Sequence, residues 1–141
     1  MSLYAESSAV LAWLLGEPGS ARAREALVEA DVVVASDLTL VECERILLRA
    51  VAQGPLTEVD AVDRRAHLTA AARHWHVLRL GEEVTERARR PFPAEPIRTL
   101  DALHLASALV ARSAVPGLAF LSLDERLRTS ARGLGFAVRP S

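Results

Sequence analysis

The chain has 141 residues, of which 50% are hydrophobic and 25% are charged, and its formal net charge is −1. These values are typical of a soluble globular protein, and the length leaves room for one compact domain over residues 1–141 but not for two. No apolar run approaches the roughly 20 residues that span a bilayer, and the N-terminus lacks the pattern of a signal peptide. We therefore expect a cytoplasmic protein with no membrane partner.

The near-zero net charge excludes a strong overall attraction to nucleic acid. All seventeen basic residues are nevertheless Arg, and the chain has no Lys. Composition leaves two explanations open: a genome of high GC content, which favours Arg codons, or arginines that bind phosphate groups bidentately. The only cysteine, Cys43, cannot form an internal disulfide, which agrees with a reducing compartment.

Strand and helix patterns alternate along the first half of the chain. Three consecutive Val residues at positions 32–34 indicate a buried strand, and Gly54 followed by Pro55 is typical of a helix end. In chain order, the predicted elements are a strand over residues 2–6, an apolar run over 9–15, a helix over 20–30, a strand over 31–35 and a helix over 37–53.

The second half of the chain continues this alternation. Thr57 and Asp60 resemble a capping box at the start of a helix, and three prolines between positions 91 and 96 forbid a helix there. In chain order, the predicted elements are a helix over residues 57–74, a strand over 76–80, a helix over 82–90, a loop over 91–96, a helix over 99–112, a strand over 118–122, a helix over 124–134 and a strand over 136–139.

Five strands separated by helices predict an α/β fold. The expected architecture is a doubly wound, mainly parallel five-stranded sheet with helices on both faces. Such a fold binds ligands beyond the carboxyl ends of its strands, near the point where the strand order reverses. The polar residues that follow strands or open helices are therefore the candidates for a functional site.

Four acids lie where this rule points. Glu6 ends the first strand, and Glu42 lies early in the helix after the Val-rich strand. Asp101 opens the helix after the Pro-rich loop, and Asp124 directly follows the fourth strand. Divalent cations such as Mg²⁺ prefer oxygen ligands, and two such ions can activate water and stabilise the leaving oxygen of a phosphodiester. These acids therefore indicate metal-dependent chemistry on phosphodiesters.

Each acid also has a purely structural explanation. Asp124 suits a helix N-cap, and Asp101 lies in a first helical turn, where an acid favours the helix dipole. Glu6 could be the solvated end of a strand. Helical spacing places Glu42 between apolar residues, but it does the same for Glu44, so periodicity leaves both residues open.

Four segments resemble the motifs of PIN domains. Residues 4–11 are similar to the Tyr-x-Asp-Ser/Thr-Ser-Ala opening, and residues 98–106 are similar to the Leu-Asp-Ala-x-His-Leu-Ala helix start of VapC-type toxins. Residues 40–45 and 121–127 resemble the second and the final acid motifs. The order and the spacing agree over residues 3–139, so the chain resembles a PIN-domain ribonuclease of the VapC toxin type.

The resemblance implies a set of site residues. The catalytic acids would be Glu6, Glu42, Asp101 and Asp124. The ligands of Mg²⁺ or Mn²⁺ would be Glu6, Asp101 and Asp124. The residues that support the acids or bind the substrate would be Ser8, Ser122 and His104.

Two of the supporting residues have structural alternatives. Ser8 could instead be a helix cap. His104 lies three residues after Asp101 and could orient its carboxylate, but a core histidine without a catalytic role is the alternative. A further departure is Glu6 itself, because the first acid of the family is normally Asp and Mg²⁺ tolerates little distortion of its coordination.

The resemblance further implies an activity and partners. The expected protein is an endoribonuclease that cleaves structured RNA by two-metal hydrolysis, acts as a toxin, is held inactive by a cognate antitoxin protein and forms a homodimer. Because of Glu6, the alternative is a catalytically impaired PIN fold that binds RNA or protein. An unrelated doubly wound phosphatase is disfavoured, because the first strand lacks an Asp-x-Asp pair and no Gly-rich phosphate loop is present.

Overall fold

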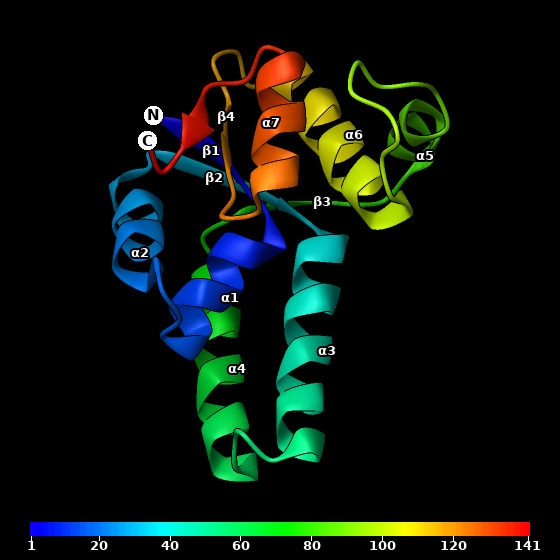
Figure 1. Cartoon of the computed structure of the whole chain (residues 1–141). Coiled ribbons are helices and arrows are strands. Elements are labelled where there is room, and N and C mark those ends of the chain that lie inside the picture. Colours follow the sequence, from blue (N-terminus) through cyan, green and yellow to red (C-terminus); the bar gives the residue numbers. More distant parts are fainter.

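A parallel sheet of five strands forms the centre of the molecule (Figure 1); the computed structural model describes residues 1–141. The strands lie in the order β3-β2-β1-β4-β5, and every neighbouring pair is parallel. They are β1 (Ser2–Ala5), β2 (Val32–Ser36), β3 (His76–Leu78), β4 (Ala119–Leu121) and β5 (Val138–Arg139). The predicted doubly wound sheet is therefore confirmed.

The strand order reverses at β1. From β1 the chain proceeds to β2 and β3 on one side, and it then returns to β4 and β5 on the other. Ala5 lies opposite Leu121 in the pairing of β1 with β4, and the backbone N–H of Glu6 donates to the carbonyl of Leu121 at 3.0 Å. The residues that directly follow β1 and β4 therefore lie side by side, at the point where such folds bind ligands.

Seven helices surround this sheet. They are α1 (Ser7–Leu15), α2 (Ser20–Glu29), α3 (Asp37–Gln53), α4 (Glu58–Ala72), α5 (Glu82–Ala88), α6 (Thr99–Ala114) and α7 (Glu125–Gly133). None of them is both long and apolar enough to cross a bilayer.

The helices cover both faces of the sheet, as the alternation of side chains along β1 shows. Tyr4 points into the core that β1 and β4 share with α5, α6 and α7. Leu3 and Ala5 point to the opposite face, where they pack with residues of α1, α2, α3 and α4. The predicted layers are therefore confirmed, with a separate core on each side of the sheet.

Most element boundaries agree with the predictions, and the third strand shows why one does not. The pattern predicts a strand over residues 76–80, but β3 ends at Leu78. β3 pairs only with β2, and its last pair is Leu78 opposite Ser36. Because α3 begins at Asp37, no strand remains with which Arg79 can pair.

α3 and α4 form a helix pair that extends away from the sheet (Figure 1). Gly54 caps the end of α3, where it has a φ of +98° and donates its N–H to the carbonyl of Ala50 at 3.1 Å. α4 begins with the predicted capping box, in which Thr57 and Asp60 exchange side-chain to backbone hydrogen bonds. The turn between the two helices is therefore fixed by the cap at Gly54 on one side and by the capping box at Thr57 on the other.

Gly54→Ala is expected to lower the free energy of unfolding by about 1 kcal/mol, because a residue with a Cβ is strained in the left-handed region. An added Cβ would meet no atom within 4 Å, so a steric clash would not contribute. Gly54→Asn is the matched control and should cost less, because Asn tolerates this conformation. Urea unfolding measures both variants, and equal losses would contradict a backbone origin.

Candidate active site

Glu6 is a buried carboxylate at the carboxyl end of β1. Its side chain is only 5% exposed and caps α1, where it accepts a hydrogen bond from the backbone N–H of Ser8 at 3.1 Å. The hydroxyl of Ser8 also donates to this carboxylate, and the hydroxyl of Ser122 does so at 2.7 Å. Glu6 is therefore not a solvated strand end, and Glu6 rather than Ser8 is the helix cap.

The two serine hydroxyls connect the end of β1 to the end of β4. Ser122 accepts a hydrogen bond from the backbone N–H of Asp124 at 3.0 Å, and Ser8 accepts one from the backbone N–H of Leu123 at 2.9 Å. Each hydroxyl therefore donates to Glu6 and accepts from the segment that leads into α7. The prediction that Ser8 and Ser122 lie beside the acids agrees with these contacts.

Asp124 is the N-cap of α7. Its Oδ1 accepts hydrogen bonds from the backbone N–H groups of Arg126 at 2.9 Å and Leu127 at 3.2 Å. The structural interpretation of this acid is therefore correct. Asp124 also lies beside Ser122, whose hydroxyl donates to Glu6. Asp124 can therefore cap α7 and also belong to the candidate site.

Asp101 lies in the first turn of α6 and is paired with an arginine. Its Oδ2 is 3.2 Å from Nε of Arg98, and 17% of its side chain is exposed. A small cavity of about 50 Å³ is lined by Asp101 together with Arg126 and Leu127 of α7. Asp101 therefore borders the start of the helix that Asp124 caps, although no hydrogen bond joins the two acids.

Glu42, rather than Glu44, faces the site. Its Oε1 lies 2.5 Å from Nε2 of His104 and accepts a hydrogen bond from the hydroxyl of Ser7 at 2.7 Å. Glu44 instead pairs with Arg65 of α4 at 2.9 Å. The structure therefore decides between the two acids that periodicity could not separate.

His104 does not orient Asp101, so of its two interpretations the core histidine agrees with the structure. Its side chain is 1% exposed, with Nε2 at Glu42 and Nδ1 at 2.9 Å from the hydroxyl of Tyr4. Asp101 and His104 are three residues apart and therefore lie about one helical turn apart on α6. The side chain of His104 contacts Tyr4 and Glu42, however, whereas that of Asp101 contacts Arg98. His104 is a buried core histidine whose polar partners come from α3, β1 and α1.

Two residues of the site escaped the sequence analysis. Ser7 bonds Glu42, and Arg128 donates to the carbonyls of Ser122, Arg139 and Pro140 at 2.8, 3.1 and 2.8 Å. Serines and arginines are common in this chain, and nothing in their spacing marks these two. Their partners come from distant segments, so only the fold identifies them.

Glu6 and Glu42 have opposite electrostatic environments. Burial raises the pKa of Glu6, and the hydrogen bonds it accepts and the nearby His104 oppose this only in part. Burial also acts to raise the pKa of Glu42, but hydrogen bonds from His104 and Ser7 outweigh it and lower the pKa. Glu42 is therefore the acid held as a carboxylate, whereas Glu6 is the one that resists ionisation.

The acids form two hydrogen-bonded groups that meet at the end of β1. One group joins Glu6 to the Asp124 backbone through Ser122, and the other joins Glu42 to His104 and Ser7. Ser7 directly follows Glu6, so the two groups are adjacent. Asp101 is bonded to neither of them.

A divalent cation fits this site by donor chemistry. Carboxylate oxygens suit Mg²⁺ and Mn²⁺, and no Arg or His is ion-paired with the buried Glu6. No three His, Cys, Asp or Glu side chains are positioned as a ready ligand group. The acids would therefore have to rotate toward a common point to hold an ion.

The raised pKa of Glu6 predicts a pH dependence of stability. The stability that comes from a protonated Glu6 is fully present below its unfolded pKa of about 4.5 and is lost as pH rises through the higher folded value. Relative to Glu6→Gln, the wild type should therefore become less stable between about pH 4 and neutrality. Urea unfolding of both proteins in chelator measures this, and a constant difference across the range would contradict it.

The PIN-domain family matches residues 3–132 of this chain. Ribonuclease VapC46 of Mycobacterium tuberculosis is 34% identical over 137 residues, which cover 97% of this chain and 95% of that protein. The residues 3–132 that the family model matches include every residue of the two hydrogen-bonded groups described above.

Solved structures show the same fold. VapC20 of Mycobacterium tuberculosis, a sarcin–ricin loop cleaving toxin, has a TM-score of 0.67 and 18% identity over 97% of both chains. A toxin–antitoxin complex from Klebsiella pneumoniae has a TM-score of 0.63 and 15% identity over 94% of both chains. These structures show the fold, and the family match together with the identity to VapC46 shows that the chain belongs to the PIN-domain family, in which its relatives are VapC ribonucleases.

Proposed function

We propose that this chain is a metal-dependent endoribonuclease that cleaves structured RNA and acts as the toxin of a toxin–antitoxin pair. The observation that carries the proposal is the meeting of Glu6, Ser122 and Asp124 where the strand order reverses, with Glu42 beside them. The RNA substrate is supported by the family, whose relative VapC46 is named a ribonuclease.

Glu6, Asp101 and Asp124 are the residues that would hold Mg²⁺ or Mn²⁺. When bound, such an ion supplies a Lewis acid that activates water and neutralises charge on the phosphodiester. Two serine hydroxyls donate hydrogen bonds to Oε2 of the buried Glu6 and hold its carboxylate at the end of β1. Asp124 uses only Oδ1 for the cap of α7, so Oδ2 remains for a ligand role.

We infer that Glu42 acts as the general base, even though its lowered pKa makes it a weaker base than an ordinary Glu. Its lowered pKa keeps it ionised at neutral pH, and about a quarter of its side chain is exposed, so water can reach it. Both hydrogen bonds from Ser7 and His104 go to Oε1. Oε2 is therefore the atom that would accept the proton of the attacking water.

A second candidate function is an RNA- or protein-binding module with impaired catalysis. It is favoured by one observation: both oxygens of Glu6 accept hydrogen bonds, at a position where the family normally carries the shorter Asp. A carboxylate fixed in this way is less able to complete the strict octahedral geometry of Mg²⁺. An assay of RNA cleavage distinguishes the two functions.

Glu42→Gln and Asp101→Asn should each lower the rate of RNA cleavage by at least about a hundredfold, because each removes a charge and keeps the size of the side chain. Glu44→Gln is the matched control and should retain the wild-type rate, because Glu44 pairs with Arg65 outside the site. The assay uses a labelled RNA hairpin with Mg²⁺, with Mn²⁺ and with chelator. Cleavage that persists in chelator would refute the metal dependence of the reaction. If the wild-type protein does not cleave the RNA under any of these conditions, the binding module is favoured.

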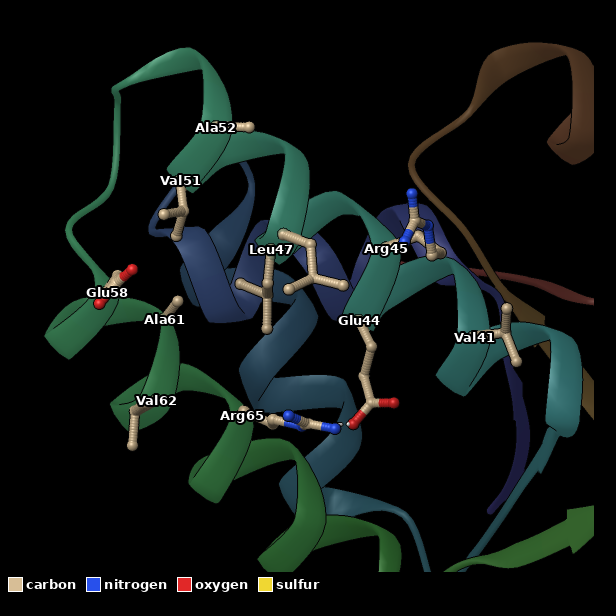
Figure 2. A pocket seen from close by; sticks show the side chains of 11 residues that line it. Val41, Glu44, Arg45, Leu47, Val51, Ala52, Glu58, Ala61, Val62 and Arg65 are labelled. Atoms are coloured by element: carbon tan, nitrogen blue, oxygen red, sulfur yellow. Dashed lines mark hydrogen bonds and ion pairs between the residues drawn. The ribbon is translucent and has the colours of Figure 1, made fainter.

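We also propose a binding surface for the antitoxin. A groove of about 510 Å³ lies between α3 and α4 and is lined mainly by apolar side chains (Figure 2). Val41, Leu48 and Val62 in this groove are more than half exposed. Val41 directly precedes Glu42, so the groove begins beside the acids of the candidate site.

This geometry suits an amphipathic helix that ends in a basic segment. The apolar face of such a helix would cover Leu48 and Val62, while an Arg at its end could pair with the carboxylate of Glu42. The toxin–antitoxin complex from Klebsiella pneumoniae shares the fold and supports an antitoxin as the partner.

Leu48→Glu should weaken antitoxin binding at least about tenfold without changing RNA cleavage, because it places a charge in the apolar groove. Val59→Glu is the matched control, since Val59 is 78% exposed on α4 but does not line the groove. The partner that co-purifies from the native host is identified by mass spectrometry, and its affinity is measured by calorimetry. Equal affinities for Leu48→Glu and wild type would place the antitoxin elsewhere.

A further inference from the structure

A line of buried hydrogen bonds runs from the interior of the sheet to Glu42. The hydroxyl of Tyr4 on β1 lies 3.2 Å from the hydroxyl of Ser36 and 2.9 Å from Nδ1 of His104. The other ring nitrogen of His104, Nε2, lies 2.5 Å from Oε1 of Glu42. Tyr4, Ser36 and His104 are at most 1% exposed, whereas Glu42 reaches the surface of the site.

The hydroxyl of Tyr4 needs an explanation beyond packing. The Tyr4 ring is stacked on Phe120 with 5.5 Å between the centroids, and it lies in an apolar core. A Phe at this position would fill the same space without the cost of burying a hydroxyl, which is recovered only through hydrogen bonds. The hydrogen bond to His104 offsets the cost of burying the Tyr4 hydroxyl. We therefore look for the role of this hydroxyl in its effect on the His104 ring.

The contacts of His104 determine which nitrogen carries its proton. A carboxylate is an acceptor only, so Nε2 must be protonated to bond Glu42. The Tyr4 hydroxyl contacts Nδ1, and this contact keeps the ring from turning over, so that Nε2 stays at Glu42. The hydroxyl of Ser7 approaches both Nε2 and Oε1, at 3.2 and 2.7 Å, and closes the arrangement around the carboxylate.

We propose that Tyr4 and His104 are positioning residues for cleavage: Tyr4 fixes the ring of His104, and His104 holds Oε1 of Glu42 so that Oε2 faces the substrate. The inference rests on the proposed nuclease function for its effect on rate, but not for its structural part. Neither Tyr4 nor Ser36 touches the substrate, so Tyr4 acts on the reaction only through His104 and Glu42.

Tyr4→Phe tests the proposal because it removes one buried oxygen and keeps the aromatic stack. We expect kcat for hairpin RNA cleavage to fall about tenfold or more, with KM within about twofold, since misplacing a reacting group slows chemistry and leaves binding intact. Arg112→Leu is the control: it removes a hydrogen bond of α6 to the Leu134 carbonyl, far from Glu42, and should keep the wild-type kcat.

Conservative substitution of His104 provides a second measurement. His104→Gln places an amide N–H near the position of Nε2 and should retain more activity than His104→Leu, which has no donor. If the two variants lose the same activity while both remain folded by circular dichroism, His104 fills space only and the proposal is overturned.

The protonation of His104 gives a readout that does not require catalysis. In ¹⁵N-labelled protein, NMR should show Nε2 of His104 protonated throughout in the wild type and only in part in Tyr4→Phe. An unchanged His104 signal in Tyr4→Phe overturns the inference, and so does a changed signal with unchanged kcat. A wild type that shows the expected signal but does not cleave RNA refutes the proposed function instead, and leaves the hydrogen-bonded line established.

Discussion

The parallel pairing of β1 with β4 is the constraint on which the candidate site depends. It joins the first strand to one from the last quarter of the chain, and it places Glu6 beside Ser122. All contacts between the first acid and the segment before α7 follow from this pairing, because both strands end at the same edge of the sheet. The pairing also buries Tyr4, from which the hydrogen bonds to His104 and Glu42 extend.

The two acids at this edge illustrate how burial can have opposite results. Glu6 and Glu42 both lose hydration, but Glu42 accepts a hydrogen bond from a ring nitrogen whereas Glu6 accepts only from neutral hydroxyl and amide groups. Environments that separate the pKa values of neighbouring carboxyls are typical of sites that divide the work of catalysis between them. A cation near Glu6 would stabilise its ionised form, which neutral donors alone stabilise too little to offset burial.

The sequence predicts most of the fold, because strand and helix periodicities are clear and Gly54, Pro55 and the Pro-rich loop interrupt them. It also predicts which acids follow strands. The sequence does not predict the role of a residue whose hydrogen-bond partner comes from another segment of the chain. Glu42 and Glu44 are equivalent by helical spacing, and only the positions of His104 and Arg65 separate them. The interpretation that His104 orients Asp101 fails for the same reason, since proximity in sequence suggests Asp101 and the fold supplies Glu42.

The capping of α7 by Asp124 has an evolutionary consequence. Replacing an acid of an active site commonly stabilises a protein, since such groups are placed for chemistry rather than for folding. Here most replacements of Asp124 would also remove the acceptor for two backbone N–H groups, at a cost of about 1 kcal/mol. Under the proposed function, inactive descendants of this chain would therefore gain no stability by losing this acid, and selection for a more stable but inactive protein would not favour its replacement.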